Sequence, residues 1–200
     1  MIYVGIDYSM TSPAICILTE KVIEFHYWIT KTQHKISLVN QQIKEFISED
    51  GLVFKLFPYI KENDPSWNND IERFMSLAVW SNSIIDIVKE TYQTHDVKIA
   101  IEGYSFGSSG ARVFQIAENC GILKFSFEQN KYQWNVVPPT QIKKFATGKG
   151  NANKEKMEEA FVEKMKFSPR DWVHQTKKQM NPSSDIIDAY FIADWLRTQH

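Results

Sequence analysis

The chain has little of what several classes of protein require. It has only two cysteines, Cys16 and Cys120, and both stand in apolar surroundings without CxxC or Cys/His spacing, which argues against disulfide frameworks and zinc sites. Positive charge is not in excess, because 23 basic residues face 24 acidic ones, so any nucleic-acid site must be a local patch. Polar residues interrupt every hydrophobic run, and no signal peptide is visible. We therefore expect one reduced, cytoplasmic domain over residues 1–200, without a membrane span.

Three short apolar runs open the chain and predict β-strands. They cover residues 2–7, 14–18 and 22–29, and each is bounded by polar or turn-forming residues. The link between the second and third runs, residues 19–21, has the length of a hairpin loop. The pattern therefore predicts an antiparallel meander of three strands.

Two of the expected strands end in a carboxylate. Asp7 ends the first strand, and Glu102 ends a later apolar run over residues 97–102. The residue two positions earlier, on the same strand face, is small in both cases: Gly5 and Ala100. If the two strands lie side by side, both acids meet at one edge of the sheet, where α/β folds commonly have their sites. The alternative is that each acid merely ends its strand in solvent.

A second pair of acids, Asp185 and Asp188, interrupts the apolar run over residues 183–196. In a helix these two side chains lie about 60° apart, so they can act together. Ser183 and Ser184 are N-cap candidates, and the helix dipole favours negative charge in the first turn. Burying a lone carboxylate is costly unless it is paired or bound to a metal. The alternative is one acid at the helix start and one exposed acid.

The middle of the chain has a weaker pattern. A short helix is plausible over residues 38–47, ended by residues 49–51. The aromatic, proline-containing run over residues 54–60 is interpreted as part of an inserted loop or subdomain that covers about residues 30–69. Apolar residues at helical spacing then predict a long amphipathic helix over residues 71–92.

A glycine-rich loop over residues 103–110 follows the second acidic strand and carries Tyr104 and Phe106. Both rings are candidate platforms for stacking unpaired nucleic-acid bases. The alternative is that they pack back onto their own domain. A helix over residues 111–127 and a short strand over residues 134–137 complete this part of the chain.

Lysines gather around a second glycine-rich segment, residues 148–154, which lies between a helix capped by Thr140 and a helix over residues 155–165. Free backbone N–H groups at a helix start, together with ammonium groups, form a phosphate-binding site. The GxxxxGK[ST] spacing of nucleotide-binding loops is missing, so a nucleic-acid backbone is the better ligand. The alternative is a set of solvated surface lysines. The candidate lysines are Lys143, Lys144, Lys149 and Lys154.

The order of these motifs resembles the RuvC family of Holliday-junction resolvases. The matching pieces are Ile-Asp at the end of the first strand, Ile-Glu-Gly-Tyr after a central strand, Pro-Pro-Thr-Gln-Ile-Lys-Lys followed by Gly-Lys-Gly, and Asp-Ile-Ile-Asp-Ala near the end. They cover most of the chain, and their combination rather than any one piece is specific. The resemblance implies an α/β architecture with the ribonuclease H-like fold. Its mixed five-stranded sheet would have three antiparallel N-terminal strands plus two parallel strands, flanked by α-helices.

The same resemblance implies a homodimer that cuts a four-way DNA junction symmetrically, using two Mg²⁺ ions per active site, with Mn²⁺ able to substitute. Lys149 and Lys154 fall in the family's DNA-contacting segment. Two departures stand out: the long stretch over residues 30–69, and Tyr-Ser-Met in place of the family's Pro-Gly after the first acid. A viral version of the enzyme, acting in the host cytoplasm, is our working hypothesis. The family's four catalytic, metal-binding acids would correspond to Asp7, Glu102, Asp185 and Asp188.

The chemistry favours the same class of protein. Two cations about 3.5–4 Å apart can activate a water and stabilise the leaving oxygen of a phosphodiester. Acids without a His or Cys cluster suit Mg²⁺ or Mn²⁺ better than zinc. Three alternatives remain: a broader branched or flap DNA nuclease, a junction-binding module that does not cleave, and an actin-like ATPase. The ATPase fold needs two such domains and a second glycine-rich Asp loop, which this sequence does not provide.

Overall fold

The computed structural model describes residues 1–9, 12–30, 44–49, 51–61, 81–89, 96–104, 112–173 and 181–200. In these residues the centre of the molecule is a mixed seven-stranded sheet, with the order β4-β5-β3-β2-β1-β6-β7. The strands are β1 (Ile2–Asp7), β2 (Ala14–Leu18), β3 (Val22–Thr30), β4 (Lys44–Ile47), β5 (Val53–Lys61), β6 (Val97–Glu102) and β7 (Gln133–Val137). The helices are α3 (Arg112–Gln129), α4 (Pro139–Thr147), α5 (Lys154–Met165), α6 (Pro169–Trp172) and α7 (Ser183–Arg197). Residues 81–89 are also helical.

The five strands that the sequence predicted are all present with the expected directions. β1, β2 and β3 form the antiparallel meander, β6 lies parallel to β1, and β7 lies parallel to β6. The turn between β2 and β3 is closed by Thr19, whose hydroxyl accepts a hydrogen bond from the N–H of Val22 at 2.9 Å. Serine and threonine hydroxyls commonly close such turns.

The structure describes residues 44–49 and 51–61 of the stretch interpreted as an inserted loop or subdomain, and most of these residues form strands rather than a loop. β5 lies parallel to β3 and β4 lies antiparallel to β5, so both strands extend the sheet. Residues 44–47 are therefore strand rather than the end of the helix predicted over residues 38–47. Phe54 and Leu56 alternate into the core, which is the strand period. Pro58 masked that period, but it lies beyond the part of β5 that β4 pairs, where a proline removes no hydrogen bond to β4.

Two helices predicted from the sequence fall partly outside the described residues. Residues 31–43 and 62–80 are not described, so most of the helix predicted over residues 38–47 and much of the one over residues 71–92 lie there. The described residues 81–89 are helical, as predicted. In the described part of the chain, no helix has the length and hydropathy needed to cross a membrane.

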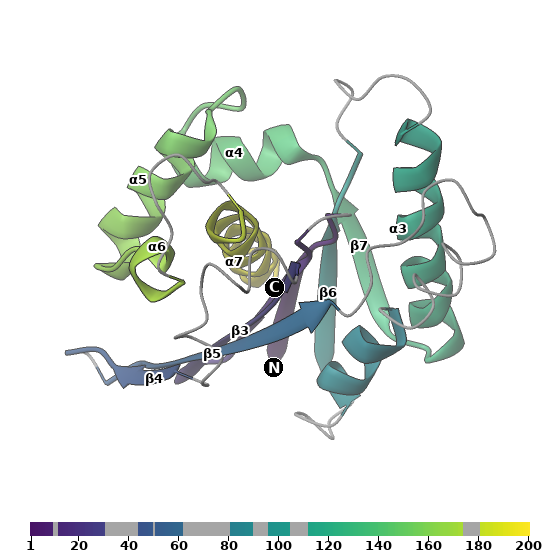
Figure 1. Ribbon diagram of the computed structural model, residues 1–200, viewed down its shortest axis with the longest axis horizontal. Coiled ribbons are helices and arrows are strands. Elements are labelled where there is room, and N and C mark those ends of the chain that lie inside the picture. Colours follow the sequence, from purple (N-terminus) through teal and green to yellow (C-terminus); the bar gives the residue numbers. More distant parts are fainter. Residues whose placement is uncertain are drawn as a thin grey trace.

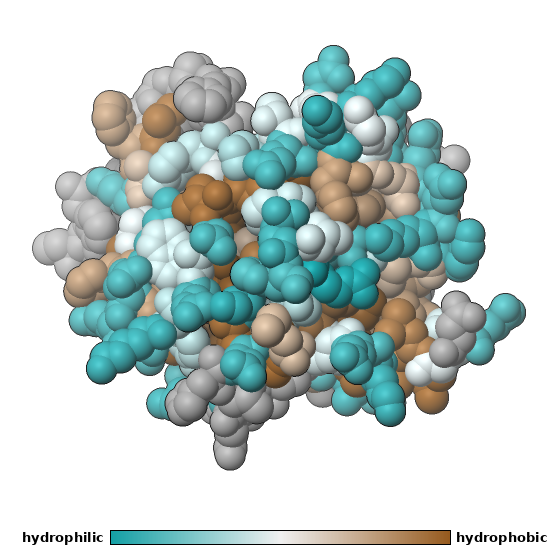
Figure 2. Space-filling view, turned by 180° about the vertical axis from the view of Figure 1, so that it is seen from behind, coloured by the Kyte–Doolittle hydropathy of each residue, from teal (hydrophilic) through white to brown (hydrophobic). Residues whose placement is uncertain are grey.

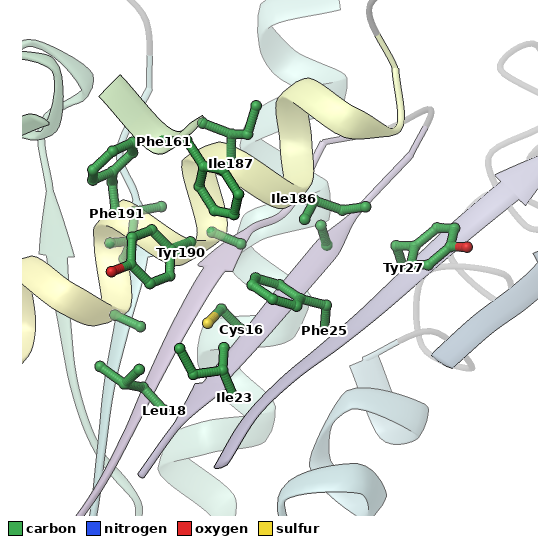
Figure 3. Close-up of a cluster of buried hydrophobic side chains, with 14 of the residues drawn as sticks. Cys16, Leu18, Ile23, Phe25, Tyr27, Phe161, Ile186, Ile187, Tyr190 and Phe191 are labelled. Carbon is green, nitrogen blue, oxygen red and sulfur yellow. The ribbon is translucent and has the colours of Figure 1, made fainter. Parts of the chain in front are cut away.

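Helices cover both faces of the sheet (Figure 1). α7 lies on one face, with α4, α5 and α6 around it, whereas α3 and the helical residues 81–89 lie on the other. On the α7 face, aromatic and aliphatic side chains from the meander meet those of α5 and α7, among them Phe25, Phe161 and Tyr190 (Figure 3). The outer surface seen in Figure 2 mixes hydrophilic side chains with separate hydrophobic patches.

α7 packs unusually closely on β1 because Gly5 has no side chain. A Cβ atom at Gly5 would lie 2.2 Å from the carbonyl oxygen of Ala189 and 2.3 Å from the backbone nitrogen of Ala193. The partner of Gly5 on β6 is Ala100, which is also small. The space left beside Asp7 by these small residues is thus filled by the backbone of α7.

Two helix starts differ from the predicted caps. α4 begins at Pro139 with Pro138 at its N-cap position, so Thr140 lies inside the first turn rather than capping it. A proline suits a first turn because its missing N–H would have no helical partner there. α7 begins at Ser183 after Pro182 and has no side-chain cap. The hydroxyl of Ser184 instead contacts Asn181 Oδ1 at 2.9 Å.

Candidate active site

Asp7 and Glu102 lie next to each other at one edge of the sheet. β1 and β6 are parallel neighbours, with Ile6 opposite Ile101, so the following residue of each strand is an acid. Asp7 is buried, with 7 % of its surface exposed, and Glu102 is half-buried. The two strands that end in acids therefore do lie side by side, and neither acid simply ends its strand in solvent.

The close contact of α7 with Gly5 brings the second pair of acids to the same place. Asp185 lies in the first turn of α7 and is 4 % exposed, while Asp188, one turn later, is half-buried. Asp7 interacts electrostatically with Asp185, Glu102 and Asp188. The four acids, scattered over 180 residues of sequence, thus form one cluster, which we call the acid cluster.

Burial raises the pKa of every member of the acid cluster, and repulsion by neighbouring acids raises the pKa values of Asp7, Glu102 and Asp188 further. Burial raises the pKa of Glu102 to about 7 and that of Asp185 to about 6. The pKa of Asp7 lies well above its usual value because of burial and then the charge of Asp185, and that of Asp188 is raised by burial and then Glu102. Like charges this close cannot all ionise without compensation. At neutral pH the acid cluster can therefore ionise fully only if positive charge lies close to it.

Two lysines supply part of that charge. Lys143, in α4, and Lys154, at the start of α5, both lower the pKa of Glu102 and of Asp188. The Lys154 ammonium donates hydrogen bonds to Ser184 Oγ at 3.0 Å and to Asn181 Oδ1 at 3.2 Å. Of the four lysines singled out in the sequence, these two lie at the acids. The other two, Lys144 and Lys149, are exposed, as Lys154 also is.

The aromatic candidates are only partly described. Tyr104 follows β6 by two residues, and 45 % of its surface is exposed. The Lys124 ammonium lies 4.7 Å from the centre of its ring. An exposed ring under a cation leaves one face available for stacking, so the role predicted for Tyr104 stays a prediction. Phe106 lies outside the described residues.

Two polar residues at the acid cluster were missed in the sequence. Ser12 is fully buried and donates its hydroxyl hydrogen to Asp185 Oδ2. The side chain of Asn181 donates to Ser12 Oγ at 2.8 Å. These partners are 173 and 169 residues apart in sequence, and no local pattern relates them. The only signal is that each precedes a proline, which marks a turn without indicating a role.

Asp194, a further acid of α7, is a structural carboxylate and differs from the acid cluster in its partners. It is fully buried, and it accepts hydrogen bonds from Lys164 and, at 2.6 Å, from Arg197. Two cations therefore pair directly with one acid. The acid cluster has the opposite balance, with four carboxylates and two nearby ammonium groups, so Asp194 is an ordinary ion pair and the cluster is not.

The donor atoms of the acid cluster are all carboxylate oxygens, which fit hard divalent cations such as Mg²⁺ or Mn²⁺. Among the described residues, no three acidic, histidine or cysteine side chains are arranged around one ready-made ion position. Asp7 and Asp185 lie close enough to raise the pKa of Asp7. A divalent ion bound between such acids would offset their repulsion, and the residue types fit such an ion.

Sequence comparisons identify no relative, since neither a family model nor a curated protein matches the chain. Solved structures do match. Thermus thermophilus RuvC has a TM-score of 0.55 at 13 % identity, over 100 % of this chain and 97 % of that one. The same protein in complex with a Holliday junction substrate has a TM-score of 0.53 at 12 % identity, over 96 % and 90 %. The yeast mitochondrial Holliday junction resolvase has a TM-score of 0.52 at 14 % identity, over 98 % and 78 %.

At these identities the likeness concerns the fold. It covers the full length of this chain. The two additional strands, β4 and β5, raise the strand number above the five that were predicted but leave the order of the others intact. The chain therefore has the ribonuclease H-like fold of RuvC.

Proposed function

We propose that the protein is a divalent-metal-dependent endodeoxyribonuclease that resolves four-way DNA junctions by paired phosphodiester hydrolysis. The convergence of Asp7, Glu102, Asp185 and Asp188 at one sheet edge carries this proposal. The fold, shared with RuvC bound to a Holliday junction substrate and with a mitochondrial resolvase, supports branched DNA as the substrate. The viral origin remains a hypothesis on which none of these observations bears.

In this proposal the four acids hold the ions, two per active site. When bound, Mg²⁺ or Mn²⁺ supplies activation of the attacking water and stabilisation of the leaving 3′ oxygen. The chain itself fixes the geometry, because the acids stand on β1, β6 and α7, elements locked together at Gly5. Fixed ligands lose little entropy and need no rearrangement of the backbone during the reaction.

The lysines have separable roles in this proposal. Lys143 and Lys154 act within reach of the acids, where an ammonium group stabilises negative charge on the phosphate undergoing cleavage. Lys144 and Lys149 are exposed and would contact phosphates along the DNA backbone. Tyr104, exposed beside β6, would stack on an unpaired base near the branch point.

A junction offers two equivalent strands, so paired cleavage requires two active sites and hence a homodimer. α3 offers a suitable face. Phe114 and Phe125 are 72 % and 63 % exposed, and they stand about three turns apart on the same side of the helix. Large exposed apolar side chains of this kind commonly mark protein–protein contacts. We propose that α3 of one subunit packs against α3 of its partner.

The decisive test incubates the purified protein with end-labelled four-way, flap and linear duplex DNA, with and without Mg²⁺. We expect symmetric paired cuts in the four-way junction that depend on Mg²⁺. Asp7→Asn and Glu102→Gln should bind the junction as tightly as the wild type and cleave none of it. Cleavage retained in these amide variants would refute the site, and equal cleavage of flap DNA would favour the broader branched-DNA nuclease.

A further inference from the structure

Asp185 stands at the end of a chain of hydrogen bonds that begins at Lys154. The Lys154 ammonium donates to Asn181 Oδ1 at 3.2 Å, and Asn181 Nδ2 donates to Ser12 Oγ at 2.8 Å. Ser12 Oγ then donates to Asp185 Oδ2. Ser184 braces the chain, since its hydroxyl accepts from Lys154 at 3.0 Å and contacts Asn181 Oδ1 at 2.9 Å.

The chemistry of these groups allows only one direction along the chain. An ammonium group has donors and no acceptor, so it must face the oxygen of the Asn181 amide. The amide nitrogen therefore faces Ser12, whose oxygen must accept. The hydroxyl of Ser12 has a single hydrogen, and that hydrogen is left for Asp185. The position of one cation thus fixes the direction of every hydrogen bond in the chain, so that Ser12 donates to Asp185.

The chain also ties together three separate parts of the fold at the acid cluster. Ser12 precedes β2, Asn181 precedes α7, and Lys154 is the first residue of α5. The Asp185 end of the hydrogen-bond chain is shielded from solvent, because Ser12 is fully buried and Asp185 is nearly so. In such surroundings aligned hydrogen bonds reinforce one another and water does not compete.

We propose that Ser12 and Asn181 are positioning residues that hold Oδ2 of Asp185, so that the rest of this carboxylate is presented to the metal-binding cluster. The inference rests on the proposed function and adds two residues to its machinery. Partners that orient a metal ligand in this way typically account for about 10- to 100-fold in metal affinity or activity. A purely structural tie between loops would instead change stability and leave ion binding alone.

The test measures Mn²⁺ binding without DNA, through the electron paramagnetic resonance signal of the free ion. We expect Ser12→Ala and Asn181→Ala to weaken Mn²⁺ binding about 10- to 100-fold. Ser126→Ala is the matched control, because Ser126 is also a buried serine but donates to the carbonyl of Ile122 inside α3 at 3.0 Å. The control should bind Mn²⁺ like the wild type. Wild-type affinity in either test variant overturns the proposal.

A second pair of variants separates the hydroxyl from packing. Ser12→Thr and Ser12→Val add nearly the same bulk at a fully buried position, but only threonine keeps the donor. We expect Ser12→Thr to bind Mn²⁺ more tightly than Ser12→Val and to retain more junction cleavage at saturating DNA. Equal affinity in the two variants overturns the positioning role, even if both are less stable than the wild type.

The same measurements distinguish a failure of the positioning role from a failure of the proposed function. If the wild type binds Mn²⁺ and cleaves junctions while Ser12→Val and Asn181→Ala do the same, the positioning role alone fails. If the wild type binds no Mn²⁺ and cleaves nothing, the metal-dependent nuclease and the positioning role fail together.

Discussion

At the scale of single residues, the acid cluster makes the fold sensitive to pH. Asp185 and Glu102 have pKa values raised to about 6 and about 7, whereas the same groups titrate near pH 4 in an unfolded chain. Between these values the folded state binds more protons than the unfolded state. The stability of the folded state therefore falls as pH rises through this range.

We accordingly expect the free energy of unfolding, measured with urea in the presence of EDTA, to decrease from pH 4.5 to about pH 7.5. Glu102→Gln removes one of the shifted groups, so its profile should be flatter across the upper half of this range. A wild-type profile that rises towards neutral pH would contradict the raised pKa values.

Divalent ions should reverse this loss of stability. An ion that binds only the folded state stabilises it by about 3 kcal/mol at a hundredfold excess over its Kd. We therefore expect Mg²⁺ or Mn²⁺ to raise the melting temperature of the wild type at pH 7.5. Asp7→Asn should melt higher than the wild type in EDTA, because it removes one repelling charge, and should gain less from the ion. Equal metal-induced shifts in both proteins would exclude Asp7 as a ligand.

At the scale of elements, the contact between Gly5 and α7 sets the position of Asp185 and Asp188. A methyl group at Gly5 would meet the backbone of α7 at 2.2 Å, and backbone atoms of a packed helix cannot rotate away. We expect Gly5→Ala to destabilise the protein by about 1–3 kcal/mol or more and to abolish cleavage, because α7 must move off β1. Thermal unfolding and the junction assay check both effects.

Gly121 provides the control for this substitution. It lies in α3, and, apart from the chain neighbours and backbone of its own helix, no atom of the described residues stands within 4 Å of the position that its Cβ would take. Alanine is the better helix former by about 1 kcal/mol, so Gly121→Ala should be neutral or stabilising. If Gly5→Ala proves equally harmless, α7 does not depend on a bare glycine for its place over β1.

The elements also show which features a sequence can reveal. Asp7 and Glu102 were found because a strand that ends in an acid is a local pattern, and parallel neighbours bring such ends together. β5 was missed because Pro58 interrupts an otherwise alternating strand, and whether a strand tolerates a proline depends on its pairing with neighbouring strands, which the sequence does not reveal. Ser12 and Asn181 were missed because their roles arise from a contact across 169 residues of chain.

At the scale of the whole molecule, the proposed dimer is what turns one acid cluster into a pair of coordinated cuts. Replacing Phe114 and Phe125 by aspartate puts two charges on each copy of the exposed α3 face, and the symmetry of the dimer would oppose like charges across the contact. We expect sedimentation of the double variant to show a monomer where the wild type shows a dimer. Both residues are exposed, so the melting temperature of the monomer fold should change little.

The same variant separates assembly from chemistry. Its acid cluster is unaltered, so it should still nick one strand of a junction in the presence of Mg²⁺, but the two nicks should no longer occur within the lifetime of one complex. A cruciform plasmid reports this difference, since paired cuts give a linear product and single cuts give a nicked circle. A dimeric double variant that still yields linear plasmid would place the subunit contact elsewhere than on α3.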